Sequence, residues 1–416
     1  MGEPMARPVS GRTPFRDVAA LPAVRVAAGT TLVIMLGYGL IVPVLPLFAL
    51  SFGVGRAAVG IMVTTFGAAR LVFDLVGGPL VDRFGERRTA TAGALIVAVS
   101  SALSALSPSF VALVGFRAIG GAGSAILFAA MMNWLVRTVP AARMARAMSL
   151  FYASFLLGTV LGQPVGGVIG EHLGLAAPLW FYAAACALAA VLILRRVTDT
   201  GGTAHPGAAG EELMSEAEGP LPSAWGRIRG LMSGRAFLVA LAANAVLFWT
   251  LAGVRMTLVP LFAKEDLGLS ESGIGATLGV AAVAQFLVMW KAGSLADERG
   301  RKVVLLPALA GLAVTTALVG MAGGAVGLGL VMAALGLATG FAGVAPGAIV
   351  ADVAPRRSGT AIGLYRFAGD VGFVLGPLVA GVTAQAAGFA AAFLALAIPP
   401  ALILLLALGT PETLRR

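Results

Sequence analysis

Two pairs of opposite charges stand inside long apolar stretches of this sequence. Arg70 and Asp74 are four residues apart, and so are Arg366 and Asp370. At this spacing two side chains share one face of a helix, so each pair can be neutralised within its own helix. Ionisable groups are costly inside a membrane and usually functional there. The chemistry they can do is proton transfer, because a carboxylate that takes up a proton releases its arginine partner.

The positions of these four charges also predict contact between the pairs. Counted at about 1.5 Å of rise per residue from one membrane face, Asp74 and Arg366 each lie about 12–14 Å deep. Arg70 and Asp370 each lie about 18–20 Å deep on the same count. Two antiparallel helices would therefore bring opposite charges level. The alternative is two static pairs, each confined to its own helix.

Two further arginines, Arg117 and Arg255, lie in apolar stretches where no acid of the same stretch is placed to neutralise them. Arg255 could attract an anionic substrate, or it could pair with Glu265 or Asp266 just beyond the same stretch. The sequence leaves both readings open.

The elements that carry these residues are long and almost free of charge. The composition is 59% hydrophobic and 12% charged, with a mean hydropathy of +0.95. About 20 apolar residues in a helix cross the ~30 Å hydrocarbon core of a bilayer. The sequence therefore predicts an all-α membrane protein with twelve transmembrane helices. Their expected ranges are 24–50, 59–81, 90–106, 110–135, 147–170, 178–194, 237–262, 273–295, 303–321, 326–350, 359–384 and 390–408.

The first predicted helix contains residues that weaken it. Gly37, Gly39, Pro43 and Pro46 all fall in its second half. Such breaks are tolerated in a membrane only where neighbouring helices or a water-filled cavity satisfy the freed backbone groups. We expect this helix to line a cavity, and a simple packing kink is the alternative.

The positive charges are distributed unevenly between the two sides of the membrane. Of 29 lysines and arginines, only Arg56 and Lys264 fall in the loops of one side. The other side is therefore cytoplasmic by the positive-inside rule, and it holds both termini. The net charge of +10 then faces anionic lipid rather than nucleic acid. We expect a multi-pass protein of the cell (inner) membrane that has the lipid bilayer, not nucleic acid, as a partner.

The sequence repeats itself once. Gly78–Arg88 (GPLVDRFGERR) is echoed by Gly293–Lys302 (GSLADERGRK), and the glycine-rich stretch Gly158–Gly167 is echoed by Gly372–Gly381. Parallel repeats are typical of transporters, with the substrate site between them near mid-membrane. The expected organisation is a disordered cytoplasmic tail (1–22), an N-terminal six-helix bundle (23–195), a cytoplasmic linker (196–235), a C-terminal six-helix bundle (236–409) and a short cytoplasmic tail (410–416). The end of the linker, Trp225–Arg235, could form a short amphipathic helix.

These motifs resemble those of the major facilitator superfamily over nearly the whole chain. Gly78–Arg88 is similar to the family's loop signature Gly-x-Leu-Ala-Asp-Arg-x-Gly-Arg-Lys, except at Pro79 and at Glu86, which replaces a usual basic residue. The run from Leu113 to Ser124 resembles the helix 4 motif. The Gly158–Gly167 run resembles the antiporter motif of twelve-helix drug–proton exchangers, with its proline one residue late.

The resemblance implies roles for particular residues. In this family helices 2 and 11 face each other. The resemblance therefore implies that an interdomain charge lock, coupled to proton binding, is formed by Arg70, Asp74, Arg366 and Asp370. It also implies a link between Arg117 and proton transfer. The loop residues implied in gating are Gly78, Asp82, Arg83, Gly85, Arg87, Gly293, Asp297, Arg299, Gly300 and Arg301. The residues of the antiporter-like motif are Gly158, Gly162, Pro164, Gly166, Gly167, Gly376 and Pro377. Candidates for the substrate cavity are Tyr38, Tyr152, Asn244, Trp249, Arg255 and Gln285.

Each of these roles has a simpler alternative. The loop arginines could be topology anchors, and the glycines could serve only close helix packing. As a set, the cavity candidates indicate a mostly apolar site with few hydrogen-bonding groups, which suits an amphiphilic solute.

The function expected from these features is export of small amphiphilic or hydrophobic compounds in exchange for protons, by alternating access. The proton gradient would supply the energy, with no cofactor and no metal, and the protein would be a monomer whose partners are its substrate and protons. One alternative is a proton symporter that takes up an organic anion or metabolite, and another is a transporter-like membrane sensor. The sequence contains no nucleotide loop, metal-ligand cluster or nucleophile–base set that would indicate an enzyme.

Overall fold

The computed structural model describes residues 15–200, 224–354 and 359–414, and every regular element in these ranges is a helix. The N-terminal half contains α1 Phe15–Ala19, α2 Pro22–Ile41, α3 Leu45–Leu50, α4 Arg56–Phe84, α5 Glu86–Ala105, α6 Phe110–Thr138, α7 Ala141–Leu173 and α8 Ala177–Arg196. The C-terminal half contains α10 Ala224–Met232, α11 Arg235–Trp249, the π-helix η1 Thr250–Leu258, α12 Val259–Glu265, α13 Glu271–Arg299, α14 Arg301–Val319, α15 Ala325–Ala342, α16 Ala345–Val353 and α17 Gly359–Leu408.

The twelve predicted membrane segments are all present. In the described part of the chain, eleven stretches of helix are long and apolar enough to span a membrane, and the last of them holds two predicted segments. Within α17 the chain turns at Gly388, which has a φ of 81°. Glycine adopts this conformation without the steric penalty of a side chain. The prediction of an all-α membrane protein with two six-helix repeats is confirmed.

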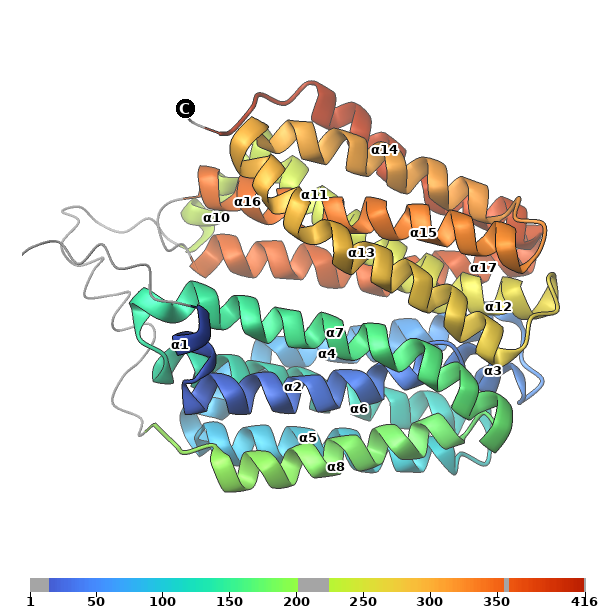
Figure 1. The fold of residues 1–416 in the computed structure, drawn as a ribbon, viewed down its shortest axis with the longest axis horizontal. Coiled ribbons are helices and arrows are strands. Elements are labelled where there is room, and N and C mark those ends of the chain that lie inside the picture. Colours follow the sequence, from blue (N-terminus) through green and yellow to red (C-terminus); the bar gives the residue numbers. More distant parts are fainter. Residues whose placement is uncertain (1–14, 201–223, 355–358, 415–416) are drawn as a thin grey trace, which may run out of the picture.

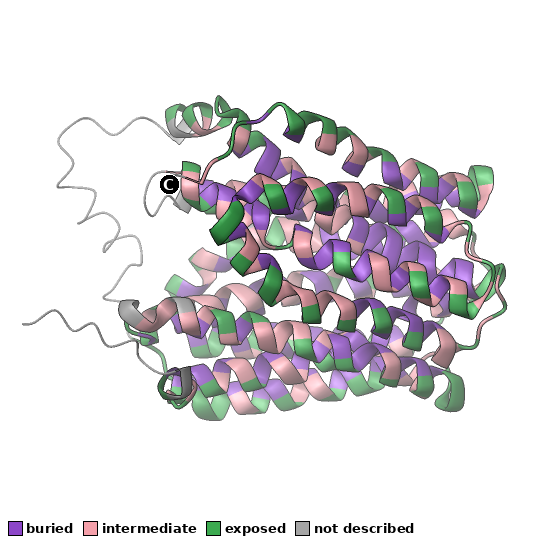
Figure 2. Ribbon diagram, turned by 45° about the horizontal axis from the view of Figure 1, so that its top comes forward, coloured by how far each residue is buried: buried purple, intermediate pink, exposed green. Residues whose placement is uncertain are grey.

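The two repeats form two bundles that lie against each other. Figure 1 shows α2 to α8 (blue to green) in one bundle and α11 to α17 (yellow to red) in the other. Large apolar side chains such as Leu188, Val314 and Leu405 are exposed on the outside of the bundles, where a lipid phase would cover them. Exposed residues lie along the outer surfaces of both bundles in Figure 2, and buried residues lie between the helices.

Several membrane segments are interrupted. Helix 1 stops at Ile41 and resumes at Leu45, so the prediction that Pro43 and Pro46 weaken it is confirmed. Helix 7 changes from α11 to the π-helix η1, a form that is common at functional sites. The sequence contained no signal for this change, because a π-turn depends on how a helix packs rather than on its composition.

Two short helices lie outside the membrane segments. Residues 1–14 lie outside the described ranges, but α1 falls within the segment expected to be a disordered tail, and its Val18 is fully buried. The tail therefore contains ordered structure. Much of the predicted linker also lies outside the described ranges, and α10 occupies its last part.

Candidate functional site

Helix 2 (α4) and helix 11 (the first part of α17) run antiparallel in a constant register. The backbone N–H of Arg56 donates to Gln385 Oε1 over 2.8 Å. Further along, Thr64 Oγ1 donates to the carbonyl of Val374, also over 2.8 Å. We call the end of the molecule with Arg56 the far end, and the opposite end, which carries the loops after α4 and α13, the motif end.

The same register brings the four intramembrane charges together where the two helices continue toward the motif end. Arg70 Nε lies 3.8 Å from Asp74 Oδ2, within α4. The Asp370 carboxyl lies close enough to Arg70, Asp74 and Arg366 to interact with their charges. Among the described residues no ion pair joins α4 to α17, so the cross-helix pairs expected from depth are not formed in this conformation.

An aromatic ring of α6 lies between the cations of this cluster. The Arg366 guanidinium carbon is 5.0 Å from the centroid of the Phe128 ring, and that of Arg70 is 5.9 Å away. The ring therefore contacts one cation from each bundle. A cation over an aromatic face is attracted to it, although the attraction is weaker than that of a carboxylate.

Glycines allow the two bundles to touch at the far end. A methyl group added to Gly381 would lie 3.0 Å from the Cα of Gly60, and one added to Gly167 would lie 3.0 Å from the Cα of Gly275. Backbone carbonyl oxygens lie closer still, 2.6 Å from a methyl group added to Gly381 and 2.7 Å from one added to Gly275. Real side chains do not fit at these distances, so the four positions require glycine for the contact. The pairs join helix 11 to helix 2 and helix 5 to helix 8, and they occupy equivalent places in the two repeats.

Beyond each glycine pair, one equivalent hydrogen bond joins the two bundles at the far end. Glu171, at the end of α7, accepts a hydrogen bond from the backbone N–H of Ser272 over 3.0 Å. Gln385 accepts one from Arg56 in the equivalent place. We call these two contacts between the bundles, helix 2 with helix 11 and helix 5 with helix 8, the seams. At both seams a side-chain oxygen of one bundle caps the first turn of a helix in the other.

The bundles do not touch in the same way at the motif end. Gly78, Gly293 and Gly363 all face open space, with no atom within 4 Å of an added methyl group. Figure 1 shows the opposite situation at the far end, where α3 and α12 lie side by side. The conformation is therefore closed at the far end.

The antiporter-like motif serves two contacts at once. Within the N-terminal bundle, Gly158, Gly162 and Gly166 lie against the backbone of α2. Within the C-terminal bundle, Gly376 lies against Trp249. On the adjoining face, residues of the motif reach across the seam. Pro164 lies against Gly279, Gly167 lies against Gly275, and the Pro377 carbonyl lies against Gly60. Close helix packing accounts for the first face, and the second makes the motif part of the contact between the bundles.

The first of the two loops for which the resemblance implies a gating role, between α4 and α5, is tied to its own bundle. Arg137, at the end of α6, donates to Asp82 and to Glu86, with both N–O distances 2.9 Å. Gly85 turns the chain with a φ of 81°, and the backbone N–H of Arg87 donates to Asp199 over 2.9 Å. Arg83 lies over the ring of its neighbour Phe84. Glu86, which stands where the family pattern usually has a basic residue, is buried and pairs with Arg137.

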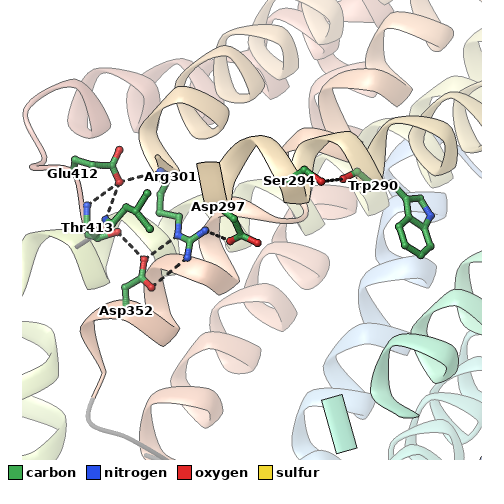
Figure 3. Close-up of polar contacts among 8 residues, drawn as sticks. Trp290, Ser294, Asp297, Arg301, Asp352, Glu412 and Thr413 are labelled. Atoms are coloured by element: carbon green, nitrogen blue, oxygen red, sulfur yellow. Dashed lines mark hydrogen bonds and ion pairs between the residues drawn. The ribbon is translucent and has the colours of Figure 1, made fainter. Parts of the chain in front are cut away.

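Figure 3 shows the second loop, in which the pair equivalent to Glu86–Arg137 recurs with its two charges exchanged. Arg301 stands where Glu86 stands in the first repeat, and it donates from Nε to Asp352 over 2.9 Å. Arg301 also pairs with Asp297 at 2.5 Å. Gly300 makes the turn with a φ of 119°, and Arg299 is exposed beside it.

The tail after α17 completes this second loop. Glu412 accepts from the backbone N–H groups of Arg301 and Lys302 over 2.9 and 3.0 Å. Burial raises the pKa of the Glu412 carboxyl, but four backbone N–H groups donate to it and hold its pKa below the ordinary value. An anion at the first turn of a helix is also favoured by the helix dipole.

The acids of the two loops face solvent. The side chains of Asp82 and Asp297 are 46% and 74% exposed, although each has an arginine partner in its own bundle. They are therefore accessible to the opposite bundle if the motif end closes.

A pocket lies between the bundles. It is lined chiefly by apolar and aromatic side chains from both bundles. The members that carry its chemistry are Tyr38, Met62, Phe66 and Arg117 from the N-terminal bundle, with Met256 and Phe373 from the C-terminal bundle. Arg117 is 3% exposed, and its guanidinium carbon lies 4.5 Å from the centroid of the Phe66 ring. The Tyr38 hydroxyl donates to Met256 Sδ over 3.6 Å.

Among the six cavity candidates, Tyr38 lines this pocket and the others lie elsewhere. Asn244 donates to the carbonyl of Tyr365 over 2.8 Å, and Trp249 donates to that of Leu396 over 3.2 Å, so both brace helix 7 within its bundle. Tyr152 is 47% exposed and packs edge-on against its neighbour Phe151.

Arg255 and Gln285 contact each other. Arg255 donates to Gln285 Oε1 over 2.7 Å and is 3% exposed. The reading in which Arg255 pairs with Glu265 is wrong, because Glu265 pairs with Arg56 across the far end. Within the described ranges Arg255 has no ion pair with Asp266 either.

Sequence reasoning missed most of the pocket. Met62, Phe66, Met256 and Phe373 are apolar residues in apolar helices, and nothing in their type separates a pocket lining from a lipid-facing surface. The usable signals were the break in helix 1 at residues 42–44, which borders the pocket, and two residues that line it, Tyr38 and the uncompensated Arg117.

Two six-helix bundles with a pocket between them define a membrane transporter rather than an enzyme. The family model of the Major Facilitator Superfamily matches residues 27–290 and 241–416. The chain belongs to the major facilitator superfamily.

Particular relatives add a comparison of sequence and shape. The chain is 27% identical over 138 residues to the quinolone resistance protein NorA of Staphylococcus aureus, which is 33% of this chain and 36% of that protein. It is 25% identical over 170 residues to an uncharacterised MFS-type transporter of Methanocaldococcus jannaschii, or 41% and 44% of the two chains. The matches thus span less than half the length of these curated relatives.

Solved structures are similar over almost the whole length. A bacterial homologue of the human lysosomal transporter Spinster, solved in an inward-facing and occupied conformation, superposes with a TM-score of 0.72 at 16% identity, over 96% of this chain and 97% of that one. The nucleoside transporter NupG gives a TM-score of 0.72 at 15% identity, over 94% and 99%. These likenesses show the fold alone.

Proposed function

We propose that the protein is a proton-coupled exporter of small amphiphilic compounds that works by alternating access. The observation that carries the proposal is the cluster of Arg70, Asp74, Arg366 and Asp370 on the helices that join the two bundles. A carboxyl that gains or loses a proton there changes the attraction between α4 and α17. Proton binding and bundle movement would then be coupled by one set of charges.

The cluster suits this task because of its composition. The two carboxyls lie close enough for their charges to interact, so a proton bound at either one removes a repulsion between like charges. A proton lost from this pair would leave two acids to face two arginines, and the cross-helix pairs Asp74–Arg366 and Arg70–Asp370 could then form. Opening and closing of the motif end would accompany this exchange of partners.

The proposed orientation follows from the charges of the loops. Most lysines and arginines lie at the motif end, which makes that end and both termini cytoplasmic in the cell membrane. The closed far end is then extracellular, and the conformation faces inward. The exposed Asp82 and Asp297 would contact the opposite bundle in the outward-facing state.

Two observations support export as the direction of transport. The printed name of the NorA relative connects it with quinolone resistance, and its match covers a third of this chain. The apolar pocket favours an amphiphilic solute over a sugar. The second candidate is proton symport of an organic anion, which the buried Arg117 favours.

Transport by everted vesicles tests the proposal. Vesicles that contain the protein are given a panel of radiolabelled drugs and metabolites, with and without an imposed acidic interior. An exporter coupled to protons accumulates its solute only while the interior is acidic, and nigericin abolishes the accumulation. Solute that moves only down its own gradient, regardless of pH, contradicts proton coupling, and any specific flux excludes a sensor that does not transport.

A further inference from the structure

The pocket between the bundles contains a positive charge without a counter-charge. Arg117 is almost fully buried, and its Nε has no hydrogen-bond partner. In the part of the chain that the structure describes, its guanidinium forms neither an ion pair nor a hydrogen bond. A buried charge without a partner is strongly unfavourable, and stacking on Phe66 offsets only part of that cost.

A second donor borders the same space. The Tyr38 ring stacks at 6.5 Å from the Phe66 ring, on which Arg117 also lies. The Tyr38 hydroxyl donates to the sulfur of Met256, which is a weak acceptor. This hydroxyl can turn to a stronger acceptor at little cost. The pocket therefore offers a cation and a hydroxyl donor, which suit a ligand group that accepts hydrogen bonds and donates none.

Apolar side chains form the remaining walls. Met62, Phe66 and Val63 of α4 face Met256 and Phe373 of the other bundle. These walls favour an aromatic or aliphatic body, and their origin in both bundles means that an occupant contacts both.

We propose that this pocket binds an amphiphilic organic anion, whose carboxylate pairs with Arg117 and accepts from Tyr38 while its apolar body lies against Phe66, Phe373 and Met256. The proposal rests on the proposed transport function and narrows its substrate from amphiphilic compounds to anionic ones. A guanidinium presents two parallel N–H donors that match a carboxylate, which favours this group over a neutral amide.

Arg255, the other buried arginine, is not part of this site. It is absent from the pocket lining and already donates to Gln285. The charge preference of the pocket should therefore depend on Arg117 alone.

Equilibrium binding to the full-length protein in nanodiscs tests the charge preference directly. The probes are phenylbutyrate, phenylbutyramide and phenylbutylamine, which share one apolar body and are anionic, neutral and cationic at neutral pH. Empty nanodiscs give the background of each probe. We expect the anion to bind at least about tenfold more tightly than the amide or the amine. An anion that binds no more tightly than the amide, or not at all, overturns the proposal.

Variants locate the effect. Arg117→Gln should weaken phenylbutyrate binding by at least about tenfold and leave phenylbutyramide binding within about twofold. Arg196→Gln, which removes an exposed arginine at the end of α8, is the matched control and should bind all three probes normally. Arg117→Lys keeps a charge but loses the paired donors, so an intermediate loss is expected, and it is the variant to use if Arg117→Gln fails to fold. Unchanged phenylbutyrate binding by either Arg117 variant contradicts the proposal.

The binding assay also separates this proposal from the proposed function. It needs no gradient, so selective anion binding without pH-driven transport supports the site and contradicts proton coupling. Conversely, pH-driven transport of a solute together with equal binding of the three probes supports coupling and overturns the anion site.

Discussion

Glu265 accepts two hydrogen bonds from Arg56 across the far end of the molecule, one from Nε over 2.8 Å and one from Nη2 over 2.5 Å. Among the described residues this is the one ion pair that joins the two bundles. Arg56 also contacts the carbonyl of Ala384 and lies 4.0 Å from the centroid of the Phe389 ring. The interaction therefore ties the start of helix 2 to the ends of helices 7 and 11.

Loss of this ion pair should favour opening of the far end. Both side chains are 28% exposed, so the pair is worth about 0.2–1 kcal/mol, and Glu265→Gln should shift the closed population by up to about fivefold. Spin labels at Leu173→Cys and Asp266→Cys, in a Cys186→Ser background, measure this as longer distances. Lys264→Ala is the control, since Lys264 pairs with Glu271 of its own bundle. Equal distance distributions in Glu265→Gln and the parent protein would contradict the prediction.

A larger residue at the glycine seam should prevent far-end closure. In Gly275→Leu the side chain meets the backbone of Gln163 and Gly167, so the bundles cannot approach. We expect transport to be lost and the spin-label distances at the far end to increase. Gly29→Leu, at a helical glycine with nothing within 4 Å, should transport normally. Normal transport by Gly275→Leu would show that the seam does not need to close.

The first gating loop should tolerate exchange of its charges. Glu86 and Arg137 are buried, with side chains 2% and 8% exposed. Replacement of Glu86 by arginine places a second cation beside Arg137, and replacement of Arg137 by aspartate places a third acid beside Glu86 and Asp82. Glu86→Arg and Arg137→Asp should each lower the free energy of unfolding by about 3–5 kcal/mol.

The double variant reproduces the arrangement of Arg301 and Asp352 in the second repeat, so it should recover most of that loss. Chemical denaturation of all four proteins in detergent measures the coupling. Additive losses in the double variant would contradict the equivalence of the two loops.

The charge cluster makes a prediction about coupling. Asp370→Asn keeps the shape of the side chain but cannot exchange a proton, so proton-driven transport should fall by about tenfold or more. Exchange of substrate for substrate, which needs no net proton movement, should persist. Glu298→Gln, at an exposed acid near the motif end, is the control. Normal proton-driven transport by full-length Asp370→Asn would exclude this residue from coupling.

The Glu412 contact predicts a dependence of stability on pH. Because the folded-state pKa of Glu412 is held below its ordinary value, its stabilising effect is present above the ordinary pKa and is lost as the pH falls through the folded-state pKa. The melting temperature of the parent protein should therefore fall more between neutral and acidic pH than that of Glu412→Gln. The variant should start lower at neutral pH. Parallel curves for the two proteins would show that Glu412 does not contribute.

The sequence predicted what depends on spacing along one chain. The twelve apolar segments, the break in helix 1 and the common depth of Arg70 and Asp370 all follow from residue counts and from proline chemistry. Depth also placed the four charges in one cluster, although it could not say which of them pair in this conformation.

What escaped prediction depends on contacts between distant segments. Nothing near Asp82 in the sequence identifies Arg137 as its partner, and nothing near Glu265 points to Arg56. The residues that line the pocket could not be predicted for a related reason. Phe66 and Phe373 differ from lipid-facing phenylalanines only in what packs against them.

The matched caps at the far end have a consequence for the origin of the protein. Gln385 bonds to the first turn of α4 as Glu171 bonds to the first turn of α13, which is the relation that a two-fold axis imposes on a homodimer. A single ancestral bundle that paired with a second copy of itself would have closed both seams with one set of residues. In the single chain the two seams are free to differ, and they differ in charge, with a carboxylate at one and an amide at the other.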